Sequence, residues 1–330
     1  MRLSPTPTIL NKMEFSPEHS GLYISAAQRE TLRQDPPPEA LHAAFATLDG
    51  DCPQPDDLLA VAVWDATRWL LRDDAAAAAR ALATLRAFLL NGQAAPAAEG
   101  WLDCLWQLLS AAHALEMLRS YAPLAAELDE HLAGLAARAA ALAAEMVAPE
   151  PLERLWWMLA QIVLGVVLDD AARFAEGAEA FHAAIHEIHP EGYFKVLVQQ
   201  TDGYSYLRQT LGVAALVLAA EAAQRAGVNL WAYENRGVGV GTAAAYVVYY
   251  YFFPDKWRWE KGLTTEQTQT WTRLYGAFLE VLAQHSEPRG LPMLFDEMRP
   301  LFCAFGGGLS SLTHGLPRPP APRRKRFGFF

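Results

Sequence analysis

The stretch LERLWWMLAQIVLGVVLDDAARFAEGAEAF (152–181) decides the fold class of this chain. Apolar residues recur at three- and four-residue spacing on both sides of Asp169 and Asp170, where the pattern stops and starts again. Carboxylates favour a helix start, because they offset the positive end of the helix dipole. The stretch therefore predicts two helices, over about 151–168 and 170–188, joined by a short turn as an antiparallel hairpin.

Most of the remaining chain repeats this unit, with short breakers such as NGQAAP (91–96) and HPEG (189–192) between amphipathic segments. The aromatic run YVVYYYFF (246–253) is the one place where a strand competes with a helix. The sequence therefore predicts an all-α fold of stacked helix hairpins, either an open solenoid or a closed α/α toroid. Further helices are expected over about 56–73, 74–91, 98–121, 124–147, 203–226, 237–252, 264–285 and 290–299.

Composition excludes several classes of protein. Hydrophobic residues make up 52% of the 330 positions and charged residues 19%, which suits a large buried core and excludes general disorder. The longest apolar run, 155–168, is too short to cross a bilayer and contains Gln161, so membrane insertion is not expected. The net charge is −10, with the acidic excess in residues 1–150, and nucleic acid is therefore not an expected partner.

Motifs for cofactors or metals are weak, and no cofactor is expected. Cys52, Cys104 and Cys303 form neither a CxxC pair nor a disulfide framework. FGGGLSSLTHG (305–315) lacks the GK[ST] ending of a phosphate loop, and its glycines are expected to let the backbone pass close to the toroid rim. His182 and His186 share a helix face, but capping or surface roles are favoured over metal binding because the helix ends at Pro190.

The chain ends differ in composition from the middle. Residues 1–20 are expected to form an extended arm, 21–315 a single toroid domain, and 316–330, LPRPPAPRRKRFGFF, a flexible basic tail rich in proline and arginine. The N-terminal MRLSPTPTILNKMEF has prolines and polar residues where a secretion signal would carry its apolar stretch.

An ordered series of segments points to a known family. The series consists of GWLDCLWQLLSAAHALEMLRSY (100–121), WWMLAQIVLGVVLDDAARFAEGAEAF (156–181), HPEGYF (189–194), LVLAAEAAQRAGVNLWAY (216–233), YYYFFPDKWRW (249–259) and RPLFCAFGGGLSSLTHG (299–315). Together these segments resemble the alginate lyase family of polysaccharide lyases, which are α/α toroids. The resemblance therefore implies an α/α toroid or an incomplete α/α barrel in place of an open solenoid. The resemblance spans roughly residues 55 to 315.

The resemblance implies β-elimination of an acidic, uronate-containing polysaccharide, and a periplasmic or secreted location with a cytoplasmic one as the alternative. The oligomeric state stays open. The Asn-Asn-His segment of the family falls here on 152–154, Leu-Glu-Arg, and its catalytic Tyr falls near Thr210 or Leu211. The alternative hypothesis is therefore a catalytically inactive carbohydrate-binding or scaffold protein on the same fold.

If the chain is active, its own phenols and guanidiniums are the candidates for catalysis. Tyr204 or Tyr206 is expected to act as base and acid, because a guanidinium one turn away on the helix can lower the pKa of a phenol. Arg208 and Arg154 are expected to neutralise the uronate carboxylate, which Arg can bind in bidentate fashion. The structural alternatives are that both phenols pack in the toroid wall and that Arg154 pairs with Glu150.

Further residues are expected to bind substrate. Sugars present apolar C–H faces that stack on indoles, and Trp156 and Trp257 are the tryptophans expected to reach the cleft. Cationic side chains from distant segments could complete a positive groove. The full set of predicted substrate-binding residues is Glu153, Trp156, Trp157, His189, Lys195, Arg236, Trp257 and Arg299.

Overall fold

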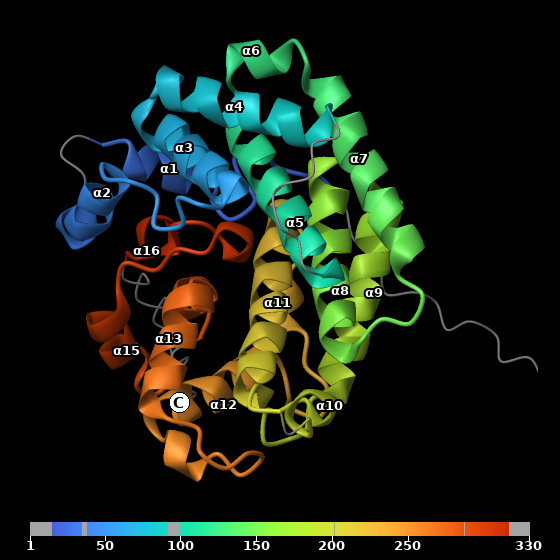
Figure 1. Cartoon of the computed structure of the whole chain (residues 1–330), viewed down its shortest axis with the longest axis vertical. Coiled ribbons are helices and arrows are strands. Elements are labelled where there is room, and N and C mark those ends of the chain that lie inside the picture. Colours follow the sequence, from blue (N-terminus) through green and yellow to red (C-terminus); the bar gives the residue numbers. More distant parts are fainter. Residues whose placement is uncertain (1–14, 35–37, 92–99, 201, 287, 317–330) are drawn as a thin grey trace, which may run out of the picture.

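The computed structural model describes residues 15–34, 38–91, 100–200, 202–286 and 288–316 (Figure 1). Its helices form two layers, and burial tells the layers apart. The inner helices are apolar on most sides, and α11 is buried along almost its whole length. They are α3 (Leu58–Arg72), α5 (Trp101–Leu118), α8 (Pro151–Val167), α11 (Ser205–Arg225) and the short α14 (Phe278–Ala283).

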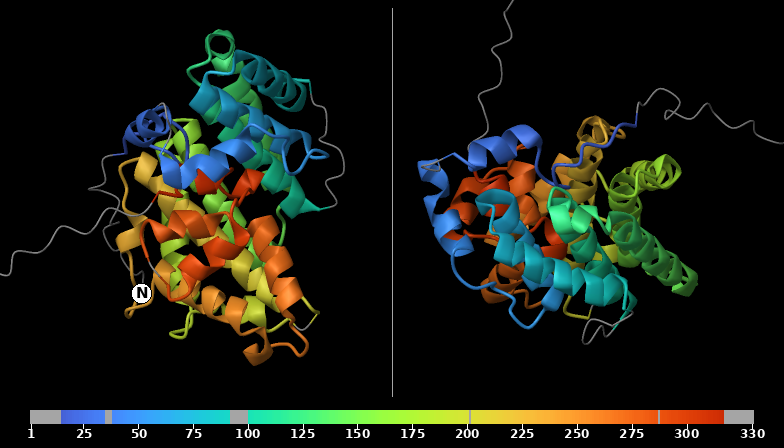
Figure 2. Two further views of the ribbon diagram at one scale, coloured as in Figure 1. Left: turned by 90° about the vertical axis from the view of Figure 1, so that its left-hand side faces the viewer. Right: turned by 90° about the horizontal axis from the view of Figure 1, so that it is seen from above.

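The outer helices each bury one face against the inner layer, as α7 and α9 show by their few buried positions. They are α4 (Ala75–Leu89), α7 (Leu128–Glu145), α9 (Ala171–Glu187) and α12 (Val240–Phe252). α13 (Thr265–Tyr275) packs against α11, α12 and α15 (Leu291–Met298). The two layers are also visible from the side and from above (Figure 2). The predicted α/α toroid of helix hairpins is confirmed.

Short helices complete the described chain. They are α1 (Ala26–Leu32), η2 (Glu39–Leu41), α2 (His42–Leu48), α6 (Ala122–Ala125), α10 (Lys195–Val198), η3 (Leu230–Ala232), η4 (Pro254–Lys256), η5 (Ala304–Gly306) and α16 (Ser310–Thr313). The aromatic run 246–253 lies in and just after α12, so the helix wins over the competing strand there. The segment 264–285, expected as one helix, is divided at Gly276 into α13 and α14.

Aspartate pairs set the start of three helices. The side chains of Asp57, Asp74 and Asp170 accept hydrogen bonds from backbone N–H groups in the first turns of α3, α4 and α9. The residues that precede two of these caps, Asp73 and Asp169, have positive φ angles of 53° and 55°. Each of these two pairs therefore turns the chain with its first residue and begins the next helix with its second.

The hairpin of α8 and α9 is closely packed because glycines stand at the contact. A Cβ atom at Gly165 would lie 2.6 Å from Cβ of Phe174, and one at Gly177 would lie 2.7 Å from Cγ1 of Ile162. Real side chains do not approach so closely, so the two helix backbones need these glycines. The stretch that predicts the fold is therefore also one of its tightest helix contacts.

The C-terminal segment packs against three of the inner helices. η5 packs against α3, α5 and α11, and Gly307 and Gly308 have positive φ angles of 104° and 69°. A Cβ at Gly308 would lie 2.9 Å from the ring of His113, on α5. The close backbone approach expected of this glycine run is confirmed at Gly308, where φ is positive and a Cβ atom would not fit.

The arm before α1 is held against α11. The backbone N–H groups of Ser16 and Glu18 donate to the carbonyls of Ala226 and Arg225. The side chains of Leu22, Tyr23 and Ile24 are buried in the common core. None of the described helices is both long enough and apolar enough to cross a bilayer.

Candidate functional site

The LERLWW segment lies in the first two turns of α8. The Glu153 carboxylate accepts a hydrogen bond from the Glu150 N–H at 2.7 Å, as part of a capping box. Arg154 is exposed, and no ion pair joins it to Glu150 or to another residue of the described chain. Its guanidinium is therefore available to an anion.

The two tryptophans of this segment differ in how deeply they are buried. Trp156 is 0% exposed, so the prediction that it reaches a cleft is wrong: the helix turns this indole into the core. Trp157 is half-buried and lies 6.0 Å from Trp101 between ring centroids. Of the two, only Trp157 retains a surface that a ligand could touch.

The start of α11 brings Tyr204 to the surface and ties down Arg208. Tyr204 is 53% exposed, and its ring centroid is 6.3 Å from that of Trp271. Both terminal nitrogens of Arg208 donate to Asp202, at 2.8 and 2.7 Å, and further bonds reach the carbonyls of Leu197 and Gln200. These bonds hold the pKa of Asp202 down at about 2, so the pair stays ionised. The guanidinium of Arg208 is therefore committed to the loop before α11.

Tyr206 is 1% exposed, and its hydroxyl donates to the carbonyl of Val247 at 3.2 Å. Burial raises the pKa of this phenol, which is the wrong direction for a catalytic base. The prediction of Tyr206 as a catalytic alternative to Tyr204 is therefore wrong, because its helix position faces α12 rather than solvent. Packing in the wall, the structural alternative, describes this residue.

The helices that carry Arg154 and Tyr204 are neighbours, but the two residues stand at different levels. A Cβ at Gly212 of α11 would lie 3.2 Å from Cδ1 of Leu155, so these positions face each other. Tyr204 precedes Gly212 by eight residues, or roughly 12 Å along a helix axis. The structure thus brings the two segments together without placing Arg154 and Tyr204 on one short ligand.

The other predicted substrate contacts come from several different segments of the chain. His189 is half-buried, stacked on Tyr193 at 4.3 Å, and its Nδ1 accepts from the N–H of Glu191. Lys195 is exposed at the start of α10, and Arg236 is exposed in a turn with a φ angle of 55°. Trp257 is 4% exposed and its indole N–H donates to Ser205, so the prediction that it reaches the cleft is wrong.

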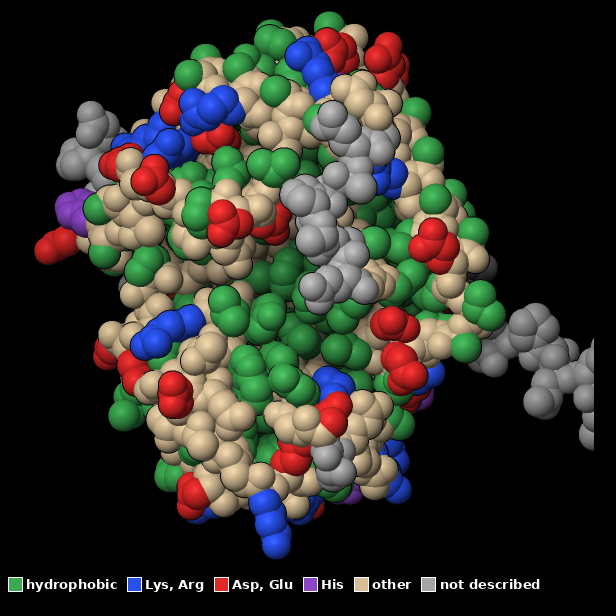
Figure 3. Space-filling view, in the orientation of Figure 1, with side chains coloured by type: hydrophobic (Ala, Val, Ile, Leu, Met, Phe, Trp, Pro, Cys, Tyr) green, Lys and Arg blue, Asp and Glu red, His purple; other side chains and the backbone are tan. Residues whose placement is uncertain are grey.

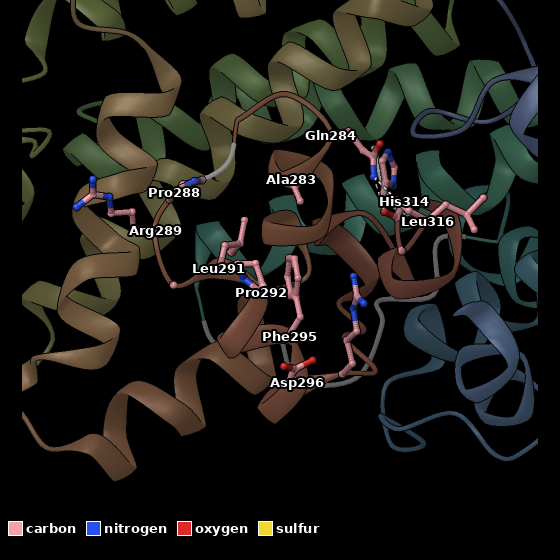
Figure 4. Close-up of a pocket in the computed structure, with 13 residues that line it drawn as sticks. Ala283, Gln284, Pro288, Arg289, Leu291, Pro292, Phe295, Asp296, His314 and Leu316 are labelled. Carbon is pink, nitrogen blue, oxygen red and sulfur yellow. Dashed lines mark hydrogen bonds between the residues drawn. The ribbon is translucent and has the colours of Figure 1, made fainter. Parts of the chain in front are cut away.

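Arg299 borders a pocket of about 650 Å³ between α14, α15 and the segment that ends at Leu316 (Figure 4). Its guanidinium donates through two nitrogens, each at 2.7 Å, to the carboxylate of Glu280, which is 0% exposed and also accepts from Ser311. Arg289, also on this pocket, is exposed and makes no ion pair within the described chain. Arg299 is therefore first of all the partner of a buried carboxylate.

An aromatic cluster, not predicted from the sequence, lies where the inner helices meet η5. Trp106 and Phe305 are stacked at 4.4 Å with their planes 1° apart, and Trp156 and Tyr275 complete the group. The face of the molecule in Figure 3 is hollowed in the region where α5, α11 and α13 lie, and its visible floor is hydrophobic. Four separate chain segments supply these rings, so the cluster cannot be predicted from any local sequence pattern.

His182 and His186 both contact Tyr233. The His186 ring nitrogen and the Tyr233 hydroxyl are 2.7 Å apart, and the ring of His182 lies 4.0 Å from that of Tyr233. Across the residues that the structure describes, no group of three or more His, Cys, Asp or Glu side chains is arranged to hold a metal ion. The two histidines therefore anchor the turn around Tyr233 to the end of α9.

The double-layered helical ring and its hollowed face define the class: an α/α toroid protein. Residues 60–257, more than half of the chain, match the alginate lyase family model. The chain therefore belongs to the alginate lyase family. No curated protein matches it in sequence.

Solved structures extend the likeness beyond the family match. A variant of alginate lyase A1-III in complex with a tetrasaccharide is 18% identical with a TM-score of 0.75, covering 96% of this chain and 100% of that one. The crystal structure of alginate lyase A1-III from Sphingomonas species A1 is 18% identical with a TM-score of 0.73, covering 95% and 100%. At this identity the likeness concerns the fold.

Proposed function

We propose that this chain is a polysaccharide lyase that cleaves a uronate polymer such as alginate by β-elimination. The observation that carries the proposal is family membership together with a fold that matches alginate lyase A1-III over nearly the whole of both chains. In this reaction a base takes the proton from C5, the C4–O bond breaks, and the departing oxygen is protonated. The product carries a C4=C5 double bond beside its carboxylate.

Tyr204 and Arg154 are the residues that we propose for the chemistry. Both are exposed, and neither side chain is engaged by a hydrogen bond or an ion pair in the described chain. The phenol of Tyr204 would move the proton at the reacting sugar. The guanidinium of Arg154, which stands at a different level, would bind the carboxylate of another uronate of the same polymer. Arg208 positions Tyr204 by fixing the Asp202 loop instead of gripping substrate.

A second candidate function is binding of the same polymer without cleavage. The observation that favours it is the chemistry of the positions where family members carry their catalytic groups. Leu211 is 4% exposed, and the Thr210 hydroxyl, also buried, donates to the carbonyl of Tyr206. Neither residue offers a proton-transfer group to a ligand.

One experiment separates the two functions. The protein is incubated with alginate and with glucuronan while ultraviolet absorbance follows the conjugated double bond of the product. Lyase activity predicts a rise that Tyr204→Phe abolishes and Tyr206→Phe retains. Absence of a rise with either polymer, combined with measurable polymer binding, would establish the binding function instead.

We also propose that the protein works outside the cytoplasm. The substrate of the proposed reaction is a polymer too large to cross a membrane, and the family resemblance supports a periplasmic or secreted location. Fractionation of the native host with an antibody against the protein tests this placement, and recovery in the cytoplasmic fraction alone would refute it.

A further inference from the structure

A continuous chain of aromatic rings crosses the outer layer near α12. Consecutive ring centroids are 4.8 to 5.4 Å apart, within the range of favourable aromatic pairs. We call it the aromatic belt, and its members in contact order are Trp259, Tyr193, Tyr246, Tyr250, Tyr249 and Phe253.

The belt reaches solvent most fully at its Phe253 end. Tyr249 is 43% exposed and Phe253 is 42% exposed, four residues apart at the end of α12. Phe253 is the C-cap residue that follows α12, and its ring centroid lies 5.0 Å from that of Tyr249. Large aromatic side chains are costly to leave in water, so an exposed pair invites a ligand with an apolar face.

A cation sits over this exposed pair. The Lys256 ammonium lies 4.4 Å from the ring centroid of Phe253 and 5.8 Å from that of Tyr249. Lys256 is exposed and has no carboxylate partner among the residues that the structure describes. Its charge is therefore free to meet an anionic group of the same ligand.

The pair is also held rigidly from behind. Tyr249 packs edge-on against Tyr250 at 5.0 Å, and Tyr250 against the buried Trp257 at 4.9 Å. The Trp257 indole N–H donates to Ser205 at the start of α11. A surface ring supported in this way loses little freedom when a ligand stacks on it.

The opposite end of the belt has similar parts but is already engaged. Arg258 lies 5.2 Å from the ring of Tyr193 and 4.9 Å from that of Trp259, but its guanidinium forms an ion pair with Glu191. The Trp259 indole N–H donates to the Tyr246 hydroxyl. The end with Lys256 is thus the one with unused binding groups.

We propose that Tyr249, Phe253 and Lys256 form a second binding site for an acidic polysaccharide, on the outer layer and separate from the site of Tyr204. A pyranose ring of the polymer would place its C–H face on the aromatic pair, and a uronate carboxylate would meet the ammonium of Lys256. The site would hold the polymer on the enzyme without touching the reacting sugar. This inference rests on the proposed function, because it assigns the same class of ligand.

The test measures polymer binding and activity separately. Affinity electrophoresis in gels containing alginate gives the dissociation constant of the full chain and of three variants: Tyr249→Ala with Phe253→Ala, Lys256→Gln, and Lys261→Gln. Lys261 is exposed and has no ring contact with the residues that the structure describes, so its variant controls for the loss of one positive charge. Circular dichroism confirms that each variant is folded.

We expect the double aromatic variant to bind alginate about tenfold more weakly and Lys256→Gln about threefold more weakly, consistent with the strength of exposed stacking and cation–π contacts. Lys261→Gln should bind like the wild type. Cleavage of a short oligosaccharide should be unchanged in the double aromatic variant, while KM for the polymer rises.

Two results would overturn the second site while leaving the proposed function standing. One is wild-type affinity for alginate in the double aromatic variant. The other is that the double aromatic variant also loses the binding to phosphatidylglycerol vesicles that the wild type shows, which would make the surface a membrane contact. A wild-type protein that neither binds nor cleaves any uronate polymer would overturn the proposed function as well.

Discussion

Replacing Arg299 by glutamine should destabilise the protein because it leaves a buried charge without its partner. Glu280 is 0% exposed, and its carboxylate accepts two hydrogen bonds from Arg299 at 2.7 Å each. Breaking a fully buried pair costs about 3–5 kcal/mol. The Arg299 side chain is 39% exposed, and Ser311 continues to donate to Glu280. We therefore expect a loss of about 2–3 kcal/mol for Arg299→Gln, below the range for full burial.

Urea unfolding followed by circular dichroism measures the effect as a lower midpoint with an unchanged slope. Arg289→Gln is the matched control, since Arg289 is exposed beside the same pocket and makes no ion pair in the described chain. It should change stability by less than about 0.5 kcal/mol. The double variant Glu280→Gln with Arg299→Gln should regain part of the loss, because no charge is then left buried.

Unfolding of Arg299→Gln at the same urea concentration as Arg289→Gln would show that the Arg299–Glu280 pair does not stabilise the fold. If Arg299→Gln kept its stability but lost affinity for alginate, Arg299 would be a substrate contact, as predicted from the sequence. Equal losses in the single and double variants would show that the carboxylate is stabilised by groups other than Arg299.

Three further perturbations test the helix packing, one buried histidine and one partly exposed histidine. Gly165→Ala places a methyl group 2.6 Å from Cβ of Phe174 and should cost about 1–2 kcal/mol net of its helix-propensity gain. Gly100→Ala, at the N-cap of α5 with no atom of the described chain within 4 Å, should cost only about 0.5 kcal/mol, because Ala is a poorer N-cap than Gly. Thermal melts compare the two, and equal melting temperatures would contradict the close hairpin contact. Burial lowers the pKa of His113 from 6.5 to about 4, so the unfolded chain binds an extra proton between these values and stability should fall on acidification through this window. In His113→Leu, the urea midpoint should fall less on acidification than it does in the wild type. The same pH dependence of the midpoint in both proteins would argue against a neutral buried ring. The Glu116 carboxylate raises the pKa of His19, so this contact stabilises the fold below pH 6.5 and weakens as pH rises through the higher folded value. Limited proteolysis of the N-terminal arm should therefore become faster with rising pH in the wild type, and this pH dependence should be weaker in His19→Gln. The same pH dependence in both proteins would show that the His19–Glu116 contact does not hold the arm.

Local sequence patterns predicted the helical architecture well. Helix starts depend on groups adjacent in the chain, such as Asp57 and Asp170, whose carboxylates bond to N–H groups two or three residues later. Hydrophobic periodicity then gives the length of each helix, because a turn repeats every 3.6 residues whatever lies across from it. The break at Gly276 within the expected helix 264–285 was missed, since a single glycine is tolerated in many helices.

The candidate site was predicted less well. An inner helix is buried on most sides, so hydrophobic periodicity does not show which of its side chains reaches solvent. Trp156 and Trp157 are adjacent in the chain, yet one is in the core and the other half-buried. Tyr204 and Tyr206 differ in the same way, because α11 is surrounded on nearly all sides and has no polar stripe to mark the solvent face.

The amino-acid sequence by itself determined the helices, their order and the family resemblance, because these depend on near neighbours in the chain and on motifs read in sequence. Only the tertiary structure decided which charges are free and which rings meet. Arg208 and Asp202 are six residues apart, but Arg299 finds Glu280, and Trp106 finds Phe305, across other elements of the fold. Contacts of that kind arise from the packing of helices, and no spacing along a single helix encodes them.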